Sequence, residues 1–270
     1  MRPILEYGSL IWDNIDNIDI LGIENVQLAA GRIVSGAIRG TSHEAIYNEL
    51  GWETLAKRRE RQQLLLFHRM MHNHCPQYLV ELVPNSTDMV HNYCTRNNTG
   101  SRLVQPRCRT EQYRQSFLPK VTRIWNSLSP EITSIENYNN FKSRLLQNKP
   151  ITNSLYYEGN RLNNIAHATM RMGCSKLHEH LFSNIHVIES PNCVCGIEEE
   201  SVEHYFFRCP LHIRSRINMI VSILQHTNLL VDDMNSDLLL YGSEHLSMDV
   251  NITIFKKVHI YIEETERFIV

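Results

Sequence analysis

The chain has 270 residues, of which 42% are hydrophobic and 21% are charged, and this globular composition excludes a chain that is disordered throughout. Its longest apolar runs, such as residues 62–67 and 236–241, are far shorter than the roughly 18 to 20 residues that span a bilayer, so we expect no membrane partner. The net charge of −2 hides a local excess, because residues 91–124 carry seven lysines and arginines and one acid.

Helical periodicity begins in the first third of the chain. Apolar residues spaced alternately three and four apart predict a helix that ends near Gly40. The residues of this apolar face are Ile23, Val26, Ala30, Ile33 and Ala37. Thr41 and Glu44 then have the spacing of a capping box, and they predict a second helix that ends at Gly51.

A longer helix should run from Glu53 or Thr54 to His74. The pair Cys75–Pro76 ends it, because proline disfavours a helical conformation in the residue before it. Its apolar side consists of Leu64, Phe67 and Met71. Its first turns carry four basic residues, which form either a solvated face or a set of phosphate contacts, and both interpretations stay open. The four basic residues are Lys57, Arg58, Arg59 and Arg61.

Between residues 83 and 116 the helical periodicity disappears. This segment is rich in arginine, has few large apolar residues and is interrupted by proline, asparagine and glycine, which predicts a long loop or loose hairpin. Any contact with a polyanion should be sought in this basic stretch. The candidate residues are Arg96, Arg102, Arg107, Arg109, Arg114, Lys120 and Arg123, with Arg58 and Arg59 as further candidates.

Amphipathic helices resume beyond the basic stretch. Two short ones are predicted by Leu118, Val121, Trp125 and Leu128, and by Tyr138, Phe141 and Leu145. Residues 149–154 resemble a linker in composition and divide the chain into predicted parts 1–150 and 151–270. In the second part, helical faces recur at residues 162–169 and 252–262. A third face consists of Ile213, Ile217, Ile220, Val221 and Leu224.

A group of three cysteines and one histidine carries the most specific chemistry in the chain: Cys193, Cys195, His204 and Cys209. Three thiolates and an imidazole are donors that Zn²⁺ prefers, and four ligands close a tetrahedron without an open position for substrate. Gly196 lets the chain fold back after the first two cysteines. The pattern predicts a structural zinc site, and the alternative is a set of ordinary buried thiols beside a core histidine.

The cysteine count also bears on the compartment. Seven cysteines are an odd and modest number for a chain of this length, and no signal segment precedes them. A disulfide framework is therefore disfavoured, and we expect a reducing intracellular compartment, the cytoplasm or the nucleus.

The loop between the two pairs of predicted ligands is acidic. It contains Glu198, Glu199, Glu200 and Glu203. Carboxylates at this density should repel phosphates, which argues against a nucleic-acid-binding zinc knuckle and favours a structural role for the ion. The aromatic residues beside the ligands are then expected in the core rather than stacked on bases.

Several longer strings carry a resemblance to a known family. RPILEYGSLIWD occupies residues 2–13, ELGWETLAKRRERQQLLLFHRM occupies 49–70, and RTEQYRQSFLPKVTRIWNSLSPEI occupies 109–132. These strings resemble the region downstream of the polymerase palm in non-LTR (LINE-type) retrotransposon reverse transcriptases. MRMGCSKLHEHLF at 170–182 and EHYFFRCPLHIRSR at 203–216 are similar to the zinc-binding segment that ends many such polyproteins.

The resemblance implies a fold but not an activity. It implies an all-α protein in which a helical, thumb-like region is followed by a helix-flanked CCHC zinc-binding segment. The long basic loop or loose hairpin belongs to the first half. The parent family is an RNA-directed DNA polymerase, whose Tyr-x-Asp-Asp or Phe-x-Asp-Asp turn holds two Mg²⁺ ions. Asp232 and Asp233 follow Val231 instead and are typical of a surface turn or helix cap. We therefore expect no catalytic residue, and a truncated, non-catalytic fragment.

Two functions of different classes follow. In the first, the fragment binds the RNA/DNA template–primer without sequence preference through its basic residues, and its protein partner is the missing polymerase palm. In the second, the chain is a structural or protein-interaction module, from a decayed or domesticated element, whose arginines are only solvated.

Overall fold

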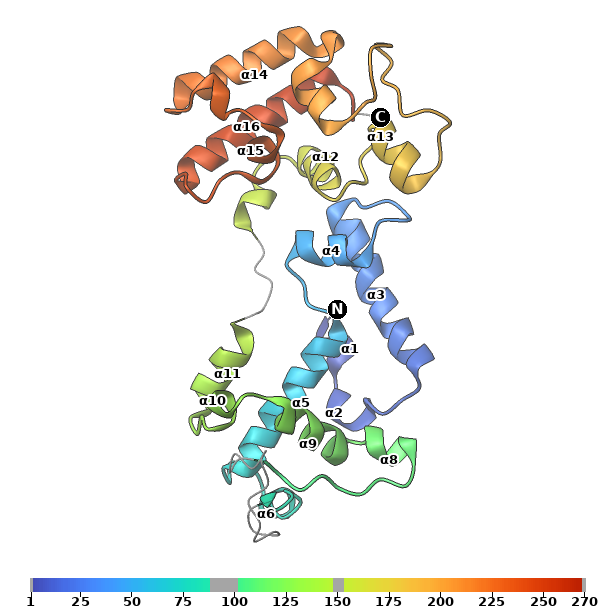
Figure 1. Cartoon of the computed structure of the whole chain (residues 1–270), viewed down its shortest axis with the longest axis vertical. Helices are drawn as coiled ribbons and strands as arrows, with labels where there is room; N and C mark the ends of the chain where they lie inside the picture. Colours follow the sequence, from blue (N-terminus) through green and yellow to red (C-terminus); the bar gives the residue numbers. More distant parts are fainter. Residues whose placement is uncertain (1, 88–101, 148–152, 269–270) are drawn as a thin grey trace. The chain divides into compact units, whose positions relative to one another are not determined.

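All regular secondary structure in the described part of the chain is helical. The computed structural model describes residues 2–87, 102–147 and 153–268, and Figure 1 shows their helices. Within these residues there is no strand, and the two isolated antiparallel bridges pair Ser86 with Leu103 and Asn192 with Glu199. The predicted all-α fold is therefore confirmed.

The chain folds into two compact units. Unit 1 comprises Met1–Gln27 and Glu53–Lys149, and unit 2 comprises Leu28–Trp52 and Pro150–Val270. The predicted parts 1–150 and 151–270 differ from these units in one segment, because residues 28–52 group with unit 2. A non-local ion pair, with Arg171 Nη2 2.6 Å from Glu49 Oε1, contributes to this grouping. Such a contact leaves no local pattern in the sequence.

The helices are short except for α3, α5, α14 and α16. The helices before residue 150 are α1 (Arg2–Glu6), α2 (Ser9–Trp12), α3 (Asn17–Ser35), α4 (His43–Leu50), α5 (Leu55–Met71), α6 (Gln77–Val80), α8 (Glu111–Gln115), α9 (Phe117–Ser127), α10 (Pro130–Thr133) and α11 (Tyr138–Leu146). Those after it are η1 (Ser154–Tyr157), α12 (Arg161–Arg171), α13 (His178–His180), η2 (Leu181–Ile185), η3 (His204–Arg208), η4 (Pro210–His212), α14 (Ile213–His226), η5 (Val231–Asp233), α15 (Ser236–Tyr241) and α16 (Met248–Thr265). Among the described residues, no helix combines the length and the apolar character that a membrane crossing requires.

The cap of α4 differs by one residue from the predicted one. The hydroxyl of Ser42, not that of Thr41, accepts the hydrogen bond from the Ala45 amide, at 3.1 Å. The Thr41 hydroxyl instead donates to the Ile38 carbonyl at 2.8 Å, so the predicted capping box is wrong. The other end is as predicted, because Gly51 adopts the left-handed conformation (φ 58°) that ends the helix.

Two other helices end earlier than predicted. Helix α3 stops before Gly36 rather than near Gly40, because Gly36 has the left-handed conformation (φ +70°). A glycine is also required there for space, since a Cβ would lie 2.3 Å from the Ile165 side chain. Helix α5 stops at Met71 because Asn73 adopts φ 58°, a left-handed conformation that asparagine tolerates. Both ends therefore depend on a backbone reversal rather than on loss of the apolar pattern.

The core of unit 1 lies between α5, α9 and α11. Phe67 and Trp125 meet edge to face with ring centroids 5.4 Å apart, and Phe141 packs against Trp125 at 5.7 Å. All three side chains are buried, as the predicted faces of these helices require. In the basic stretch, the Val104 amide donates to the Asn85 carbonyl at 2.9 Å, consistent with the base of a loose hairpin, and residues 88–101 lie outside the described part of the chain. The prediction of a loop up to residue 116 is wrong at its end, because α8 occupies Glu111–Gln115.

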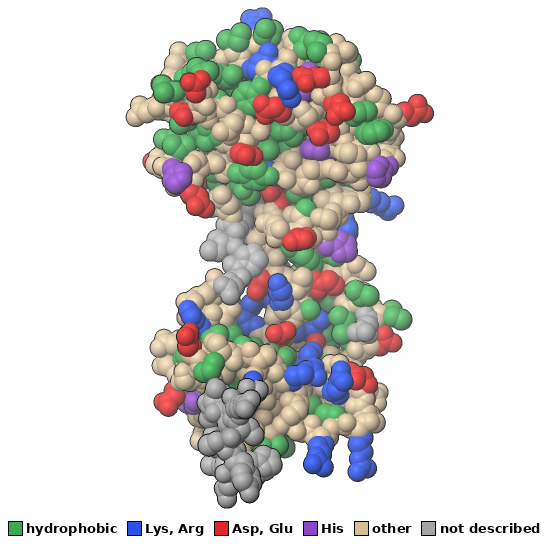
Figure 2. All heavy atoms as spheres, viewed as in Figure 1, with side chains coloured by type: hydrophobic (Ala, Val, Ile, Leu, Met, Phe, Trp, Pro, Cys, Tyr) green, Lys and Arg blue, Asp and Glu red, His purple; other side chains and the backbone are tan. Residues whose placement is uncertain are grey.

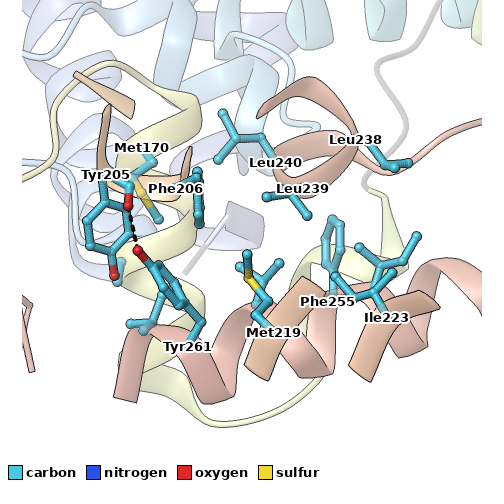
Figure 3. Packing of buried hydrophobic residues seen from close by; sticks show 14 of the residues in the cluster. Met170, Tyr205, Phe206, Met219, Ile223, Leu238, Leu239, Leu240, Phe255 and Tyr261 are labelled. Atoms are coloured by element: carbon cyan, nitrogen blue, oxygen red, sulfur yellow. Dashed lines mark hydrogen bonds between the residues drawn. The ribbon is translucent and has the colours of Figure 1, made fainter. Parts of the chain in front are cut away.

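The core of unit 2 is built by α12, α14, α15 and α16. Figure 3 shows Met219 and Ile223 of α14 beside Phe255 and Tyr261 of α16, with the leucines of α15 opposite them. The Tyr261 hydroxyl donates to a backbone carbonyl of η3 at 2.5 Å. This bond joins the core to the segment that carries His204.

The predicted face of α14 is only partly the buried one. Met219 and Ile223 are almost fully buried, whereas Ile213, Ile217 and Val221 are 54%, 54% and 44% exposed. The helix therefore has apolar residues on both its core side and its solvent side. The sequence pattern identified the helix, but of its predicted face three residues are exposed, and Ile220 and Leu224 are half-buried.

Two buried histidines should make unit 2 sensitive to acid. Burial, reinforced by Arg171, lowers the pKa of His259 to about 4, and burial lowers the pKa of His167 well below its usual value. The unfolded chain therefore binds more protons than the folded one below about pH 6.5, and stability falls as pH decreases toward 4. For His259 alone, the expected loss between pH 7 and pH 5 is about 2 kcal/mol.

Urea unfolding at pH 7 and pH 5 tests this expectation. His259→Leu should shrink the difference between the two pH values, whereas His245→Leu, at an exposed position, should leave it unchanged. An equal pH dependence in wild type and His259→Leu would show that this histidine is not responsible.

Candidate metal centre

Unit 2 brings the four predicted metal ligands together. One donor atom from each of Cys193, Cys195, His204 and Cys209 lies within 4.8 Å of every other. The sulfurs of Cys193 and Cys209 are 3.8 Å apart, and the sulfur of Cys195 is 3.4 Å from His204 Nε2. Three of the four residues are buried, and Cys195 is half-buried. The cluster could therefore hold a metal ion.

A tight turn positions the first two cysteines. The amide of Cys193 donates to the Glu198 carbonyl at 2.9 Å, and the amide of Gly196 donates to the Cys193 carbonyl at 2.9 Å. Gly196 has φ +76°, the conformation for which glycine was expected there. The Cys195 amide also points at the Cys193 sulfur, 3.5 Å away, which stabilises a thiolate at that position.

A π-helical turn positions the other two ligands. In η3 the amide of Cys209 donates to the His204 carbonyl at 2.7 Å, closing a wider turn than an α-helix would. Between the two ligands, Tyr205 and Phe206 are buried in the core of unit 2, as predicted for aromatic residues beside a structural site. The ligands are therefore anchored through the main chain to the packed helices.

A carboxylate from the acidic loop supports the histidine. His204 Nδ1 donates to Glu198 Oε1 at 2.7 Å, which leaves Nε2 as the nitrogen facing the cysteines. Arg208 Nε lies 3.3 Å from the same oxygen. A carboxylate that orients a ligand histidine is a common partner in protein metal sites. Sequence reasoning missed this role, because Glu198 is one of several acids in the loop and only its position marks it.

A second loop acid is also used internally. Glu200 is 3% exposed, and it accepts from Arg267 Nε at 2.6 Å and from the His178 amide at 2.8 Å. Burial alone would raise the pKa of Glu200, but these hydrogen bonds outweigh it and lower the pKa. The expectation that the whole loop acts as a surface repelling phosphates is thus too simple, since two of its acids stabilise the local structure.

The thiols of the cluster favour a soft cation. Burial raises the pKa of Cys193 to about 12 and also raises the pKa of Cys209, whereas the Ile197 amide lowers the pKa of Cys195. Without a cation, the two buried thiols are protonated at neutral pH, and a bound metal must displace those protons. The donor set, three sulfurs and one imidazole, fits Zn²⁺.

Replacing Glu198 with glutamine should weaken metal binding without abolishing it. The four ligands stay, but the charged partner of His204 is lost, and such changes typically reduce metal affinity about 10- to 100-fold. Competition with a chromophoric chelator measures this change. Glu199→Gln, at an exposed neighbouring position, is the matched control, and equal affinities of the two variants would contradict the assigned role.

The basic residues of the predicted nucleic-acid surface differ in their surroundings. Arg102, Arg107, Arg109, Arg114 and Arg123 are exposed in unit 1, and Figure 2 shows lysine and arginine side chains gathered on the visible face of this unit. Arg114 lies 3.3 Å from the equally exposed Glu111. The other four have no carboxylate within 4.0 Å among the described residues. We call residues 102–123 the arginine segment. Arg96 lies outside the described residues.

Three other candidates of that surface have partners inside unit 1. Arg59 is 2% exposed, with its Nε 2.6 Å from Asp13 Oδ1, and Lys120 pairs with the other oxygen of Asp13. Arg58 forms a two-pronged ion pair with Glu6. In the first turns of α5, Arg58, Arg59 and Arg61 are thus paired with acids, whereas Lys57 is exposed. Arg58, Arg59 and Lys120 are therefore not available as free phosphate contacts.

The remaining acidic pair caps a turn. Asp233 Oδ2 accepts from the Leu230 amide at 2.8 Å, and both Asp232 and Asp233 are exposed, as expected for a surface cap.

The cysteine–histidine cluster belongs to unit 2 and the arginine segment to unit 1. In comparisons with known proteins, no family model, curated protein or solved structure matches the chain.

Proposed function

We propose that the chain is a non-catalytic nucleic-acid-binding module, in which the arginine segment contacts phosphates and the cysteine–histidine cluster holds a structural zinc ion. The observation that carries this proposal is the arginine segment itself. It presents five exposed arginines, and among the described residues only Arg114 has a carboxylate partner. Guanidinium groups without a partner on the protein are suited to phosphate oxygens.

The proposed ligand is an RNA/DNA hybrid bound without sequence preference. Arginines that neutralise phosphates provide affinity but carry no sequence information. The choice of a hybrid comes from the resemblance of residues 109–132, which overlap the arginine segment, to the post-palm region of retrotransposon reverse transcriptases. The same resemblance makes a polymerase palm the protein partner of such a module.

The proposed role of zinc is to connect two chain segments. Cys193 and Cys195 would hold the ion from one side of the acidic loop, and His204 and Cys209 from the other. An ion with four protein ligands keeps no open position for substrate, so it supplies a cross-link rather than a reaction. The buried aromatic residues between the ligands then stay in the core of unit 2.

Salt dependence of binding tests the proposed phosphate contacts. The double variant Arg107→Gln/Arg109→Gln should bind a fluorescent RNA/DNA hybrid more weakly than the wild type whatever the sequence of the hybrid. The slope of log K against log salt should become shallower by about one for each phosphate contact that is lost. Fluorescence anisotropy at several salt concentrations measures both quantities.

Arg39→Gln/Arg69→Gln is the matched control, because both residues are exposed arginines outside the arginine segment. It changes the net charge by the same amount and should keep the wild-type slope. The proposal is wrong if the wild type does not bind at low salt, or if the two double variants lose affinity equally.

A further inference from the structure

The first helices of unit 1 direct their polar side chains inward. Arg58 Nη2 donates to Glu6 at 2.8 Å, and the Ser9 hydroxyl donates to Gln62 Oε1 at 2.8 Å. Asp13 is buried in the ion pairs described above. Residues 2–13 therefore attach to α5 in large part through polar side chains, whereas an amphipathic segment usually turns its polar side to solvent.

Several large apolar side chains of the same region point to solvent. Five large ones, between 61% and 87% exposed, fall within 18 residues of one another, and we call them the N-terminal apolar surface: Ile4, Tyr7, Ile11, Ile18 and Leu21. Single exposed apolar residues are ordinary, but such a concentration is typical of an interaction surface.

Unit 2 has a second exposed apolar region, on α14. Ile213, Ile217 and Val221 are spaced four apart and lie on the solvent side of this helix, while Met219 and Ile223 occupy its core side. We call these three residues the α14 stripe. A stripe at this spacing is the usual form in which a helix presents itself to a groove or to another helix.

The charges around the two surfaces are opposite. Residues 3–31 contain no lysine, arginine or histidine, and Asp16 and Asp19 are exposed there. Residues 204–231, which include α14, contain no aspartate or glutamate, and Arg214 is exposed beside the stripe. Pairing either surface with its own copy would bring like charges together, whereas pairing one with the other brings opposite charges together.

We propose that the chain self-associates head to tail, with the α14 stripe of one copy docked on the N-terminal apolar surface of a second copy. The contact buries apolar side chains at its centre and places Arg214 of one copy near the acidic rim of the other. Because two different surfaces meet, the dimer keeps one free surface of each kind, the N-terminal apolar surface on one copy and the α14 stripe on the other. Assembly therefore continues beyond the dimer unless a ring closes.

Mixing two variants tests the interface. Ile11→Asp disables the N-terminal apolar surface and Ile217→Asp disables the α14 stripe, and both positions are more than half exposed, so the fold should be retained. In analytical ultracentrifugation the wild type should form dimers and larger species as its concentration rises, and each variant alone should stay monomeric. An equal mixture of the variants should form dimers and nothing larger, because only one intact pair of surfaces remains.

Circular dichroism of each variant confirms that its helices are retained, and Ile33→Asp, at a position that is 70% exposed elsewhere on α3, is the control that should assemble like the wild type. Tyr7→Ser provides a second variant of the N-terminal apolar surface if Ile11→Asp loses helical structure. Three results would overturn the proposal: a wild type that is monomeric at every concentration, assembly by one of the single variants alone, or a mixture that stays monomeric. Assembly by one variant would mean that its intact surface pairs with itself.

Discussion

Replacing Cys209 with serine should release the metal and lower the stability of unit 2 by at least about 3 kcal/mol. Cys209 is 1% exposed, and its sulfur lies 3.8 Å from that of Cys193. The serine hydroxyl is a poor ligand for the metal, so the variant loses the ion that would link the two chain segments. Binding energy of a structural zinc ion is also folding energy, because the unfolded chain has no preformed site. Elemental analysis gives the zinc content, and hydrogen exchange gives the local stability.

The expected pattern of hydrogen exchange is local. Peptides from residues 178–226 should lose protection in Cys209→Ser, and peptides from α5 and α9 should keep it, because these helices belong to unit 1. Cys174→Ser is the matched control: this thiol is equally buried in unit 2 but lies outside the cluster, so its variant should keep the metal. Melting of unit 2 that is unchanged by a chelator would contradict a structural ion.

Replacing Asp13 with asparagine should destabilise unit 1 by about 3 to 5 kcal/mol. The Asp13 carboxylate accepts from Arg59 Nε at 2.6 Å and from Gln63 Nε2 at 2.8 Å, and it also pairs with Lys120. The Arg59 side chain is 3% exposed, so the variant leaves a buried guanidinium without a compensating charge. Losing one partner of a buried pair costs far more than the pair itself contributes.

Urea unfolding followed by tryptophan fluorescence measures this cost. In a Trp52→Phe background, Trp12 and Trp125 report on unit 1 alone. Asp19→Asn removes the same charge at an exposed position and should change the stability by no more than about 0.5 kcal/mol. If Asp13→Asn behaves like this control, the inward ion pairs do not hold the first helices of unit 1 in place.

Local patterns were sufficient to predict the described helices of eight or more residues, but not most of the shorter ones. The apolar spacing within each helix depends only on residues a few positions apart, and Phe67 of α5, Trp125 of α9 and Phe141 of α11 are buried as predicted. Helix ends were less predictable where they depend on one backbone conformation, as at Gly36 and Asn73. A left-handed residue leaves the apolar spacing before it intact, so the pattern alone extends the helix too far.

The choice of a buried face depends on tertiary contacts. On α14, both sides are apolar, and only packing against α16 makes Met219 and Ile223 the buried pair. The basic residues of α5 present the same difficulty, because Arg58 and Arg59 are neutralised by acids more than 40 positions away in the sequence. Charge patterning along one helix cannot show such partners.

The candidate site was more predictable than its surroundings. The four cysteine and histidine ligands have a donor chemistry and a spacing that are visible in the sequence, and the structure brings their donor atoms within 4.8 Å of one another. The supporting contact from Glu198 to His204 depends on how the acidic loop folds back, which no residue pattern specifies. The ligands could therefore be predicted from composition and spacing, whereas their supporting hydrogen bonds could not.

Binding of the RNA/DNA hybrid by Cys209→Ser separates the proposed roles of the two units most directly. The arginine segment belongs to unit 1, and the metal ligands belong to unit 2. If the ion is structural and the arginines bind phosphates, the metal-free variant should bind the hybrid within about threefold of the wild-type affinity at low salt, a difference of less than about 0.7 kcal/mol. A loss of affinity as large as that of Arg107→Gln/Arg109→Gln would contradict this division.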